Sequence, residues 1–307
     1  MELDRRGVLV GGAAMAVAGC APRAFPAPLL VPNIAMADLE VQAGGRLGVF
    51  VLDTASGKMT GHRHDELFGM CSTFKLALAA AVFRLADKGA LDPEMSLPYG
   101  EADMIPNSPV TRDNLPKGAM SIIALAEATQ KTSDNAAANL LIRYLGGPAA
   151  LTAIFRSWGD PVTRLDRYET AMNNVPPGEI RDTTSPRAFA QTMAKLLAGD
   201  EILKPTSRER LIQWMIGTKT GSERIRKGLP HAWRAGDKTG TGWGSTYDNK
   251  TNDVAIFWPP SRPPVIVTAY YEANGKYDEV RDADQAVLVE VGRIAAAWAV
   301  DWHVGLD

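Results

Sequence analysis

Strand-like segments occur at both ends of this chain of 307 residues, and they enclose a helical middle. Leu47–Asp53 is rich in β-formers, Ser56-Gly57 makes a turn, and Lys58–His64 returns as the second arm of a hairpin. Further strands are predicted at Trp233–Thr239, Asp253–Trp258 and Val265–Tyr271. Because antiparallel connections are short and local, we expect both ends to share one antiparallel sheet of five strands.

The middle of the chain has the period of helices. Thr73–Lys88 is apolar on nearly every face, which is typical of a buried helix. Tyr277–Trp302 is predicted as a long helix that lies on the sheet. The other predicted helices are Ile122–Thr129, Asn135–Leu145, Pro148–Trp158, Pro186–Leu197 and Arg208–Ile216.

These patterns predict an α/β protein of the α+β kind, with helices flanking the antiparallel sheet and a separate all-helical lobe. Residues 39–64 and 217–307 form the discontinuous α/β lobe in this interpretation, and residues 65–216 form the helical lobe. We expect the active site between the two lobes.

Residues 1–20 have the composition of an export signal. Arg5-Arg6 precede a short apolar run, as in twin-arginine signals. The sequence Val-Ala-Gly-Cys resembles a bacterial lipoprotein cleavage box, with a lipid anchor at Cys20; the alternative is a plain signal peptide that is cut elsewhere. Residues 21–38 are rich in Pro and Ala and are predicted to be a tether. We therefore expect a periplasmic protein, membrane-anchored if Cys20 is lipidated.

The overall composition argues against several classes of partner. The formal net charge is −2, so no general attraction to nucleic acid is expected. The four histidines form no metal-ligand motif, and we expect neither a metal nor another cofactor. Cys71 is the only cysteine besides Cys20, so no internal disulfide is expected.

Ser72 and Lys75 lie three residues apart where the buried helix begins, so their side chains share one helix face. A serine hydroxyl becomes a good nucleophile when a base takes its proton, and a lysine with a lowered pKa can be that base. Cys71 is the alternative nucleophile. No histidine lies near it in the sequence, so we expect a small buried residue there instead.

Two more polar segments follow in the chain. Ser133-Asp134-Asn135 lies between two helices, where capping of the next helix is its simplest role and is compatible with a second one. The stretch from Arg164 to Asn173 is charged and without a period, as functional loops often are, although a solvated surface loop would look the same. Arg167 and Asp182 can pair and pin the ends of this loop.

Four motifs follow one another along the chain: S-x-x-K, S-D-N, E-x-x-x-N and the K-T-G of Lys238-Thr239-Gly240. With these motifs in this order, the chain resembles the class A serine β-lactamases over about residues 40–300. The resemblance implies a hydrolase that opens the β-lactam amide of penicillins and cephalosporins through a serine acyl-enzyme and so confers antibiotic resistance. It also implies a monomer.

The resemblance assigns roles to individual residues. Ser72 would attack the β-lactam carbonyl, and either Lys75 or Glu169, the latter through a water, would take its proton. Glu169 with Asn173 would hold the hydrolytic water, Ser133 would pass a proton to the lactam nitrogen, and the backbone N–H groups of Ser72 and Thr241 would form the oxyanion hole. Asn135 would orient Lys75 and the substrate amide, and the substrate carboxylate would be bound by Arg224, Lys238, Thr239 and Thr241.

A second K-T-G, at Lys219–Gly221, follows a helix-like run, and we expect a solvated loop there. Asn107 stands where many family members have an aromatic residue, and Gly242 stands where some carbapenem-hydrolysing members have a cysteine. The segment Gly244–Thr251 is longer than usual for its hairpin, which predicts either altered specificity or a harmless exposed tip.

Other functions remain open on the sequence alone. A penicillin-binding D,D-peptidase would be acylated at the same serine but would deacylate slowly, and a β-lactam sensor would bind without turnover. Glu169 and Asn173 argue against both, because their loop supplies the hydrolytic water. A metal-dependent lactamase is disfavoured because the sequence lacks a ligand motif.

Overall fold

The computed structural model describes residues 31–243 and 247–301. The predicted export signal and Cys20 lie outside the described residues. Among the described residues, no single helix is long and apolar enough to cross a membrane; one bent pair, Asn135–Tyr144 with Pro148–Ser157, meets that test by length and composition.

The sheet joins the two ends of the chain, as predicted. Its strand order is β2-β1-β9-β8-β7, and every neighbouring pair is antiparallel. Its strands are β1 (Arg46–Asp53), β2 (Met59–His62), β7 (Arg234–Gly242), β8 (Lys250–Trp258) and β9 (Val265–Glu272). The N-terminal hairpin therefore pairs with the last strand, which places residues some 220 positions apart side by side, as in the pair Arg46 and Glu272.

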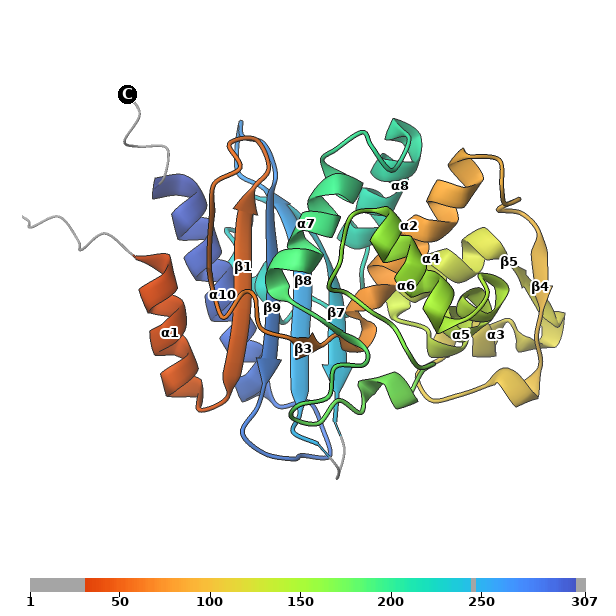
Figure 1. Ribbon diagram of the computed structural model, residues 1–307, viewed down its shortest axis with the longest axis horizontal. Helices are drawn as coiled ribbons and strands as arrows, with labels where there is room; N and C mark the ends of the chain where they lie inside the picture. The colour runs from red at the N-terminus through yellow and green to blue at the C-terminus, as the bar shows by residue number, and fades with distance from the viewer. Residues whose placement is uncertain (1–30, 244–246, 302–307) are drawn as a thin grey trace, which may run out of the picture.

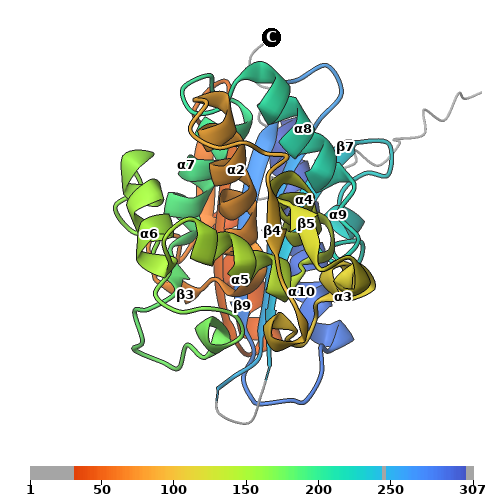
Figure 2. The ribbon, with the colours of Figure 1, turned by 90° about the vertical axis from the view of Figure 1, so that its right-hand side faces the viewer.

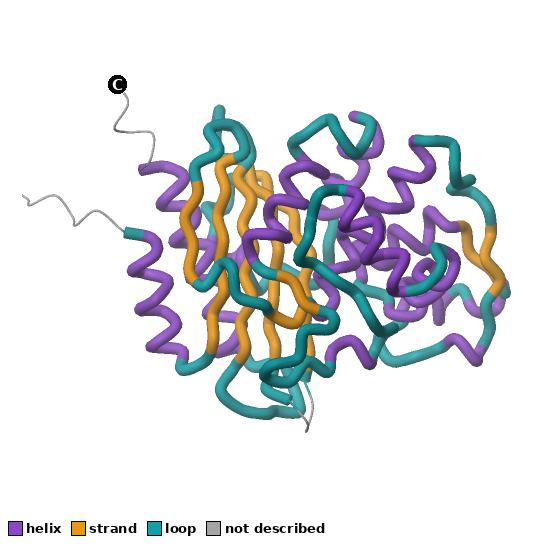
Figure 3. The backbone as a smooth tube through the Cα atoms, viewed as in Figure 1, coloured by secondary structure: helices purple, strands orange, loops and turns teal. Residues whose placement is uncertain are grey.

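Helices cover both faces of this sheet (Figures 1 and 3). One face packs against α1 (Pro32–Ala43), α9 (Ile225–Gly228) and α10 (Asp282–Asp301). The opposite face packs on α7 (Pro186–Leu197). The helical lobe lies on this same side of the sheet and faces the viewer in Figure 2. That lobe contains α2 (Phe74–Asp87), α3 (Pro109–Asp113), α4 (Ile122–Thr132), α5 (Asn135–Tyr144), α6 (Pro148–Ser157) and α8 (Pro205–Ile216).

Short ladders tie the loops of the helical lobe together. β3 (Phe68–Gly69) pairs with β6 (Thr183–Thr184), and β4 (Ser96–Pro98) pairs with β5 (Ala119–Ser121). Because β3 leads directly into α2, the first of these ladders fixes the start of that helix beside the segment that precedes α7.

The predicted tether at 21–38 is wrong for its last residues, because α1 begins at Pro32. Proline suits the first turn of a helix, and the following Ala, Met, Leu and Glu residues are good helix formers. Glu40 holds α1 against the hairpin: its carboxylate accepts hydrogen bonds from Leu47 N at 2.9 Å and from Arg63 Nε at 2.7 Å.

The last helix starts later than predicted, at Asp282 rather than Tyr277. Asp282 and Asp284 lie in its first turn, where carboxylates favour the positive end of the helix dipole. Tyr277 N instead donates to Asn249 Oδ1 at 2.9 Å, and this hydrogen bond ties the preceding loop to the β7–β8 hairpin.

Candidate active site

Ser72 lies in a 3₁₀ turn, Cys71–Thr73, at the start of α2, and this turn packs on β7. A Cβ atom on Gly240 would lie only 2.6 Å from Met70 O, so the strand approaches the turn as closely as glycine allows. Asn252 Nδ2 donates to Gly69 O at 2.9 Å and fixes the same turn from β8. Ser72 is thereby held between the sheet and the helical lobe.

Lys75 reaches Ser72 from the next turn of the helix, as their spacing predicts. Its Nζ lies 3.0 Å from Ser72 Oγ and 3.0 Å from Glu169 Oε1, and the lysine is fully buried. It also donates to Ser133 O at 2.8 Å and to Asn135 Oδ1. The buried amine is thus held by the serine, by the S-D-N segment and by one carboxylate.

The S-D-N segment caps the next helix and also contacts the lysines of the site. Asp134 caps α5, accepting from Ala137 N at 2.9 Å. Ser133 has a positive φ of 59°, and its Oγ accepts from Lys238 Nζ at 3.1 Å. Ser133 therefore lies between the two lysines of the site. Asn135 Nδ2 donates to Pro106 O at 2.8 Å, which fixes the amide that faces Lys75.

Glu169 is brought from the long loop to the serine. Ser72 Oγ donates to its Oε1 at 3.3 Å, and Asn173 Nδ2 donates to its Oε2 at 2.9 Å. Asn139 holds the backbone on both sides, because Oδ1 accepts from Glu169 N at 3.0 Å and Nδ2 donates to Glu169 O at 2.9 Å. Asn139 is not among the site residues predicted from the sequence. Its position one helical turn after Asn135 would have indicated it.

Arg167 and Asp182 pair as predicted and close the loop that carries Glu169. Asp182 is fully buried; its Oδ1 also accepts from Asp166 N at 2.7 Å and from Arg167 N at 3.0 Å. Burial raises the pKa of Asp182, and these hydrogen bonds oppose the shift. The carboxylate therefore depends on Arg167 to remain charged in the interior.

Replacing Arg167 with methionine is expected to lower the free energy of unfolding by roughly 3 kcal/mol, because Asp182 would then be buried without its partner. Chemical denaturation measures this loss. Arg164→Met is the matched control, since Arg164 pairs with Asp166 in the same loop but its side chain is 38% exposed. Its loss should stay below about 1 kcal/mol. Equal losses in both variants would show that the Arg167 pair does not hold the loop.

β7 contributes the residues predicted to bind a carboxylate. Lys238 is fully buried. The next residue, Thr239, has its Oγ1 2.6 Å from Thr220 Oγ1. Arg224 crosses under the strand: its Nη2 donates to Thr241 Oγ1 at 2.7 Å and its Nη1 to Asn252 O at 2.7 Å. The structure thus brings together all the site residues named from the sequence.

Buried carboxylates balance these cations from behind the strand. Asp237 lies 2.9 Å from Arg226 Nε, and Asp253 Oδ2 accepts from Ile225 N at 3.2 Å. Burial raises the pKa of both acids, that of Asp253 to about 6. Burial also lowers the pKa of Arg224, and Asp253 opposes that shift most strongly. The acid pair therefore offsets part of the cost of burying Arg224 and Lys238.

The first K-T-G triplet is mainly a solvated loop, as expected, because Lys219 is exposed. However, Thr220 lines the cavity in front of Ser72 through its contact with Thr239. The sequence analysis missed this contribution, since only the fold brings the segment after α8 beside β7.

These residues surround a cavity of about 380 Å³. Its lining includes Ser72, Ser133, Asn135, Asn173, Arg224, Thr239 and Thr241. Asn107 also lines it and donates to Ser133 O at 3.0 Å, so this residue braces the S-D-N turn. Within residues 31–243 and 247–301, no three His, Cys, Asp or Glu side chains are placed to hold a metal ion.

The predicted long hairpin is a wall of this cavity and not only an exposed tip. Residues 244–246 lie outside the described part, but Tyr247 is buried and lines the cavity beside Trp243. Gly242 faces Cys71: a Cβ atom added there would lie 3.0 Å from its Sγ. Cys71 is a free, buried thiol, and burial raises its pKa to about 12.

Comparison with known proteins agrees with this geometry. Residues 33–299 match the model of the beta-lactamase enzyme family. The chain is 39% identical to the carbapenem-hydrolyzing beta-lactamase KPC of Klebsiella oxytoca, over 96% of this chain and 97% of that one. It is 44% identical to beta-lactamase L2 of Stenotrophomonas maltophilia, over 84% and 83% of the two chains.

Solved structures show the same likeness. An ancestral (GNCA) class A beta-lactamase superposes with a TM-score of 0.81 at 49% identity, over 86% of this chain and 98% of that one. A beta lactamase from Burkholderia vietnamiensis superposes with a TM-score of 0.83 at 46% identity, over 89% and 97%. The chain belongs to the class A β-lactamase family.

Proposed function

We propose that the protein hydrolyses the β-lactam amide of penicillins and cephalosporins through an acyl-enzyme on Ser72. The observation that carries this proposal is the position of Ser72 Oγ, 3.0 Å from Lys75 Nζ and 3.3 Å from Glu169 Oε1. A nucleophile, a cation and a carboxylate thus meet in one buried place that opens to a cavity. Such an arrangement can both form and hydrolyse an ester.

In the acylation step, Glu169 is the group placed to accept the Ser72 proton. Lys75 Nζ lies 3.0 Å from Ser72 Oγ and 3.0 Å from Glu169 Oε1, so it bridges the nucleophile and the carboxylate. Its charge stabilises the serine oxygen as the proton leaves. Ser133, which lies between Lys75 and Lys238, then donates its proton to the lactam nitrogen as the ring opens and takes a proton from Lys75 Nζ, 3.4 Å away. Lys75 in turn takes the proton held by Glu169, 3.0 Å away, so that Glu169 is a carboxylate again before deacylation. The backbone N–H groups of Ser72 and Thr241 serve as the oxyanion hole.

In the deacylation step, Glu169 activates a water that attacks the ester. Asn173 supports this role: while its Nδ2 donates to Glu169, its Oδ1 is buried and has no hydrogen-bond partner within the described residues. A buried acceptor without a donor is costly, and a water bound between Asn173 and Glu169 would satisfy it. The loop therefore holds a site for the hydrolytic water.

The substrate carboxylate binds to Lys238, Thr239, Thr241 and Arg224. The pKa of Lys238 lies well below its usual 10.5. Burial is the main cause, and the charge of Lys75 is the second. Lys238 attracts an anion only while protonated, so this attraction is present below its pKa in the folded protein and is lost as the pH rises through it.

We therefore expect KM for a carboxylate-bearing penicillin to rise at a pH below that at which an ordinary lysine would titrate. Steady-state kinetics between about pH 6 and pH 10 measure this rise. In Lys238→Arg the guanidinium keeps its charge, so the rise should disappear from that range. A pH-independent KM in the unmodified protein would remove Lys238 from the carboxylate site.

The hydrolase function itself is tested by turnover. Purified protein without residues 1–20 is incubated with a chromogenic cephalosporin while intact mass is followed. We expect colour to develop over many turnovers with little adduct at steady state. An adduct that accumulates on the unmodified protein, with colour release of about one equivalent, would instead support the D,D-peptidase or the sensor.

We also propose that residues 1–20 direct export to the periplasm and that Cys20 carries a lipid. The support is the sequence pattern, in which an arginine pair and an apolar run precede Val-Ala-Gly-Cys. We expect the protein to sediment with membranes and Cys20→Ala to lose this association, as fractionation and immunoblotting would show. Equal partitioning of the two proteins would exclude the anchor.

A further inference from the structure

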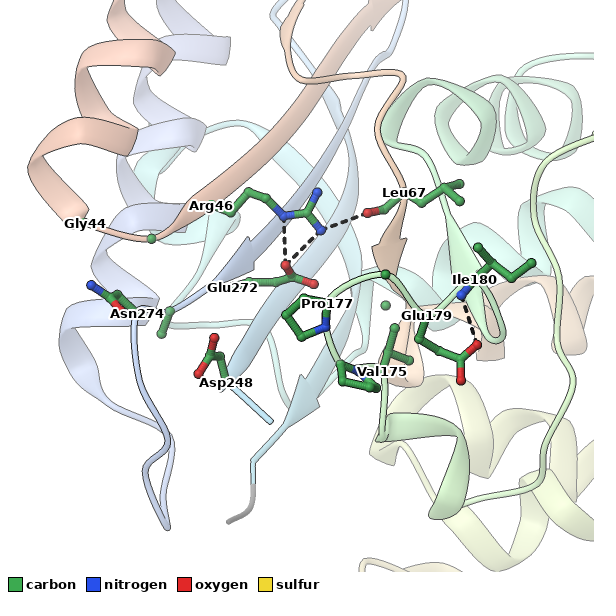
Figure 4. Close-up of a pocket in the computed structure, with 15 residues that line it drawn as sticks. Gly44, Arg46, Leu67, Val175, Pro177, Glu179, Ile180, Asp248, Glu272 and Asn274 are labelled. Atoms are coloured by element: carbon green, nitrogen blue, oxygen red, sulfur yellow. Dashed lines mark hydrogen bonds and ion pairs between the residues drawn. The ribbon is translucent and has the colours of Figure 1, made fainter. Parts of the chain in front are cut away.

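A second cavity, of about 470 Å³, is lined in part by residues 175–180, the later part of the loop that carries Glu169 (Figure 4). Gly44 and Arg46 at the start of β1 form one wall with the end of β9, and the turn from Val175 to Ile180 forms the other. It shares no lining residue with the cavity in front of Ser72. The hydrolase mechanism makes no use of it.

Arg46, the cation that lines this cavity, is already neutralised. Arg46 Nε donates to Glu272 Oε2 at 2.9 Å and its Nη1 lies 3.2 Å from Glu66 Oε2. Arg46 Nη2 also donates to Leu67 O at 2.8 Å, and the guanidinium lies 3.9 Å from the centre of the Phe68 ring. Arg46 is thus surrounded by partners and offers little to an anion.

The free charge at the cavity is negative. Asp248 lines it, and its carboxylate has no hydrogen bond or ion pair with any residue of the described chain. Figure 4 shows Asp248 on the same side as Glu272, with Pro177 and Val175 across from them. Glu179 adds a carboxylate that is already bound by Arg181. The remaining side chains are mostly apolar: Leu67, Val175, Pro176, Pro177, Ile180 and Ala273.

This second cavity also touches the wall of the active site. A Cβ atom on Gly69 would lie 3.0 Å from Lys250 Cε and 3.1 Å from Val175 Cβ, so Gly69 lies close to both side chains. Lys250 is buried, and its Nζ lies 4.4 Å from the centre of the Tyr247 ring, which lines the active-site cavity. Gly69 and Lys250 therefore form a thin partition between the two cavities.

A second connection runs along the loop. Val175 N donates to Asn173 O at 3.0 Å, and Asn173 in turn holds Glu169. The backbone at Val175 is therefore bonded to the residue whose side chain positions the carboxylate. Displacements at a general base change rates without direct contact with the substrate.

We propose that the second cavity binds a small organic cation with an apolar body, its ammonium against Asp248, and that occupancy changes the rate of deacylation through Val175 and Asn173. The rate effect rests on the hydrolase function proposed above, whereas the binding does not. A neutral or anionic molecule of the same shape lacks the ion pair and should bind more weakly.

The test is an NMR titration of the purified protein with phenethylammonium, phenethyl alcohol and 3-phenylpropionate. We expect the cation to shift the amide signals of Gly69, Gly178 and Ala273, with an affinity about tenfold above that of the other two probes. Shifts confined to Gly240 and Gly242 would place the cation in the active site instead. Equal affinities for the three probes would also overturn the proposal.

Variants separate the charge from the fold. Asp248→Asn should weaken the cation about tenfold, while Asp38→Asn, an equal charge change at an exposed position of α1, should leave the affinity unchanged. Leu67→Lys, at a lining position that is 38% exposed, adds a cation to the cavity and should also weaken binding. Unchanged affinity in both lining variants would contradict the site.

The rate effect has its own readout. Saturating phenethylammonium should change steady-state hydrolysis of a cephalosporin at least about twofold in the unmodified protein and not in Asp248→Asn. Binding without any rate change would overturn the coupling. If no β-lactam is hydrolysed at all, the NMR shifts still decide the binding site, so the two failures are distinguishable.

Discussion

Replacing Glu169 with alanine is expected to stop the reaction after the β-lactam has acylated Ser72. The carboxylate that would activate the hydrolytic water is lost, so deacylation should slow by about 10²–10⁴-fold. Acylation continues, because Lys75 Nζ still lies 3.0 Å from Ser72 Oγ and is the other base that the family resemblance offers for the Ser72 proton. Intact mass spectrometry should show protein plus one substrate mass, stable for many minutes.

A matched control comes from the same loop. Glu179 binds Arg181 and does not line the active-site cavity, so Glu179→Ala should turn over at a nearly normal rate and show no adduct at steady state. Two results would contradict the role of Glu169. One is a Glu169→Ala protein that carries no adduct after incubation with substrate, and the other is turnover equal to that of the Glu179→Ala variant.

The motifs could be recognised from the sequence because each one follows from local geometry. Ser72 and Lys75 share a helix face at a spacing of three, and Asp134 caps the helix after it. The structure explains why position 240 is a glycine, since no side chain fits between β7 and Met70 O. Local rules of this kind operate within one element or between one strand and its neighbour.

The missed features depend on contacts between distant segments. Thr220 reaches the cavity only because α8 ends beside β7, and nothing near it in the sequence indicates that neighbour. The helix that begins at Pro32 could not be predicted from the sequence for a different reason. Prolines and alanines suit both a tether and a helix start, and what decides is the burial of Met36 and the hydrogen bonds of Glu40.

The β7–β8 hairpin illustrates a third limit. Its length could be read from the sequence, but not the direction in which its side chains point. The structure directs Tyr247 toward the active-site cavity and Asp248 toward the second one. Adjacent residues of an extended segment point to opposite sides, so one insertion can supply a wall to each cavity.

Replacing Ser72 with alanine is expected to reduce turnover by about 10⁴-fold or more and to abolish any adduct, because no other hydroxyl among the described residues that line the cavity is within hydrogen-bonding distance of both Lys75 and Glu169. Cys71, the alternative considered from the sequence, does not line that cavity. It is fully buried, and burial raises the pKa of its thiol to about 12. At neutral pH almost no thiolate is present, and the thiol is a weak nucleophile.

The matched pair of variants therefore decides between two adjacent residues. Cys71→Ala should keep turnover within a few-fold of the unmodified protein and should carry the adduct when combined with Glu169→Ala. Peptide mapping of that double variant should locate the mass on Ser72. Because a buried small residue contributes packing, the Cys71 change should cost only about 1 kcal/mol of stability, too little to unfold the chain. Rapid turnover by Ser72→Ala, or loss of the adduct with Cys71, would move the nucleophile by one residue and remove the mechanism built on Lys75 and Glu169.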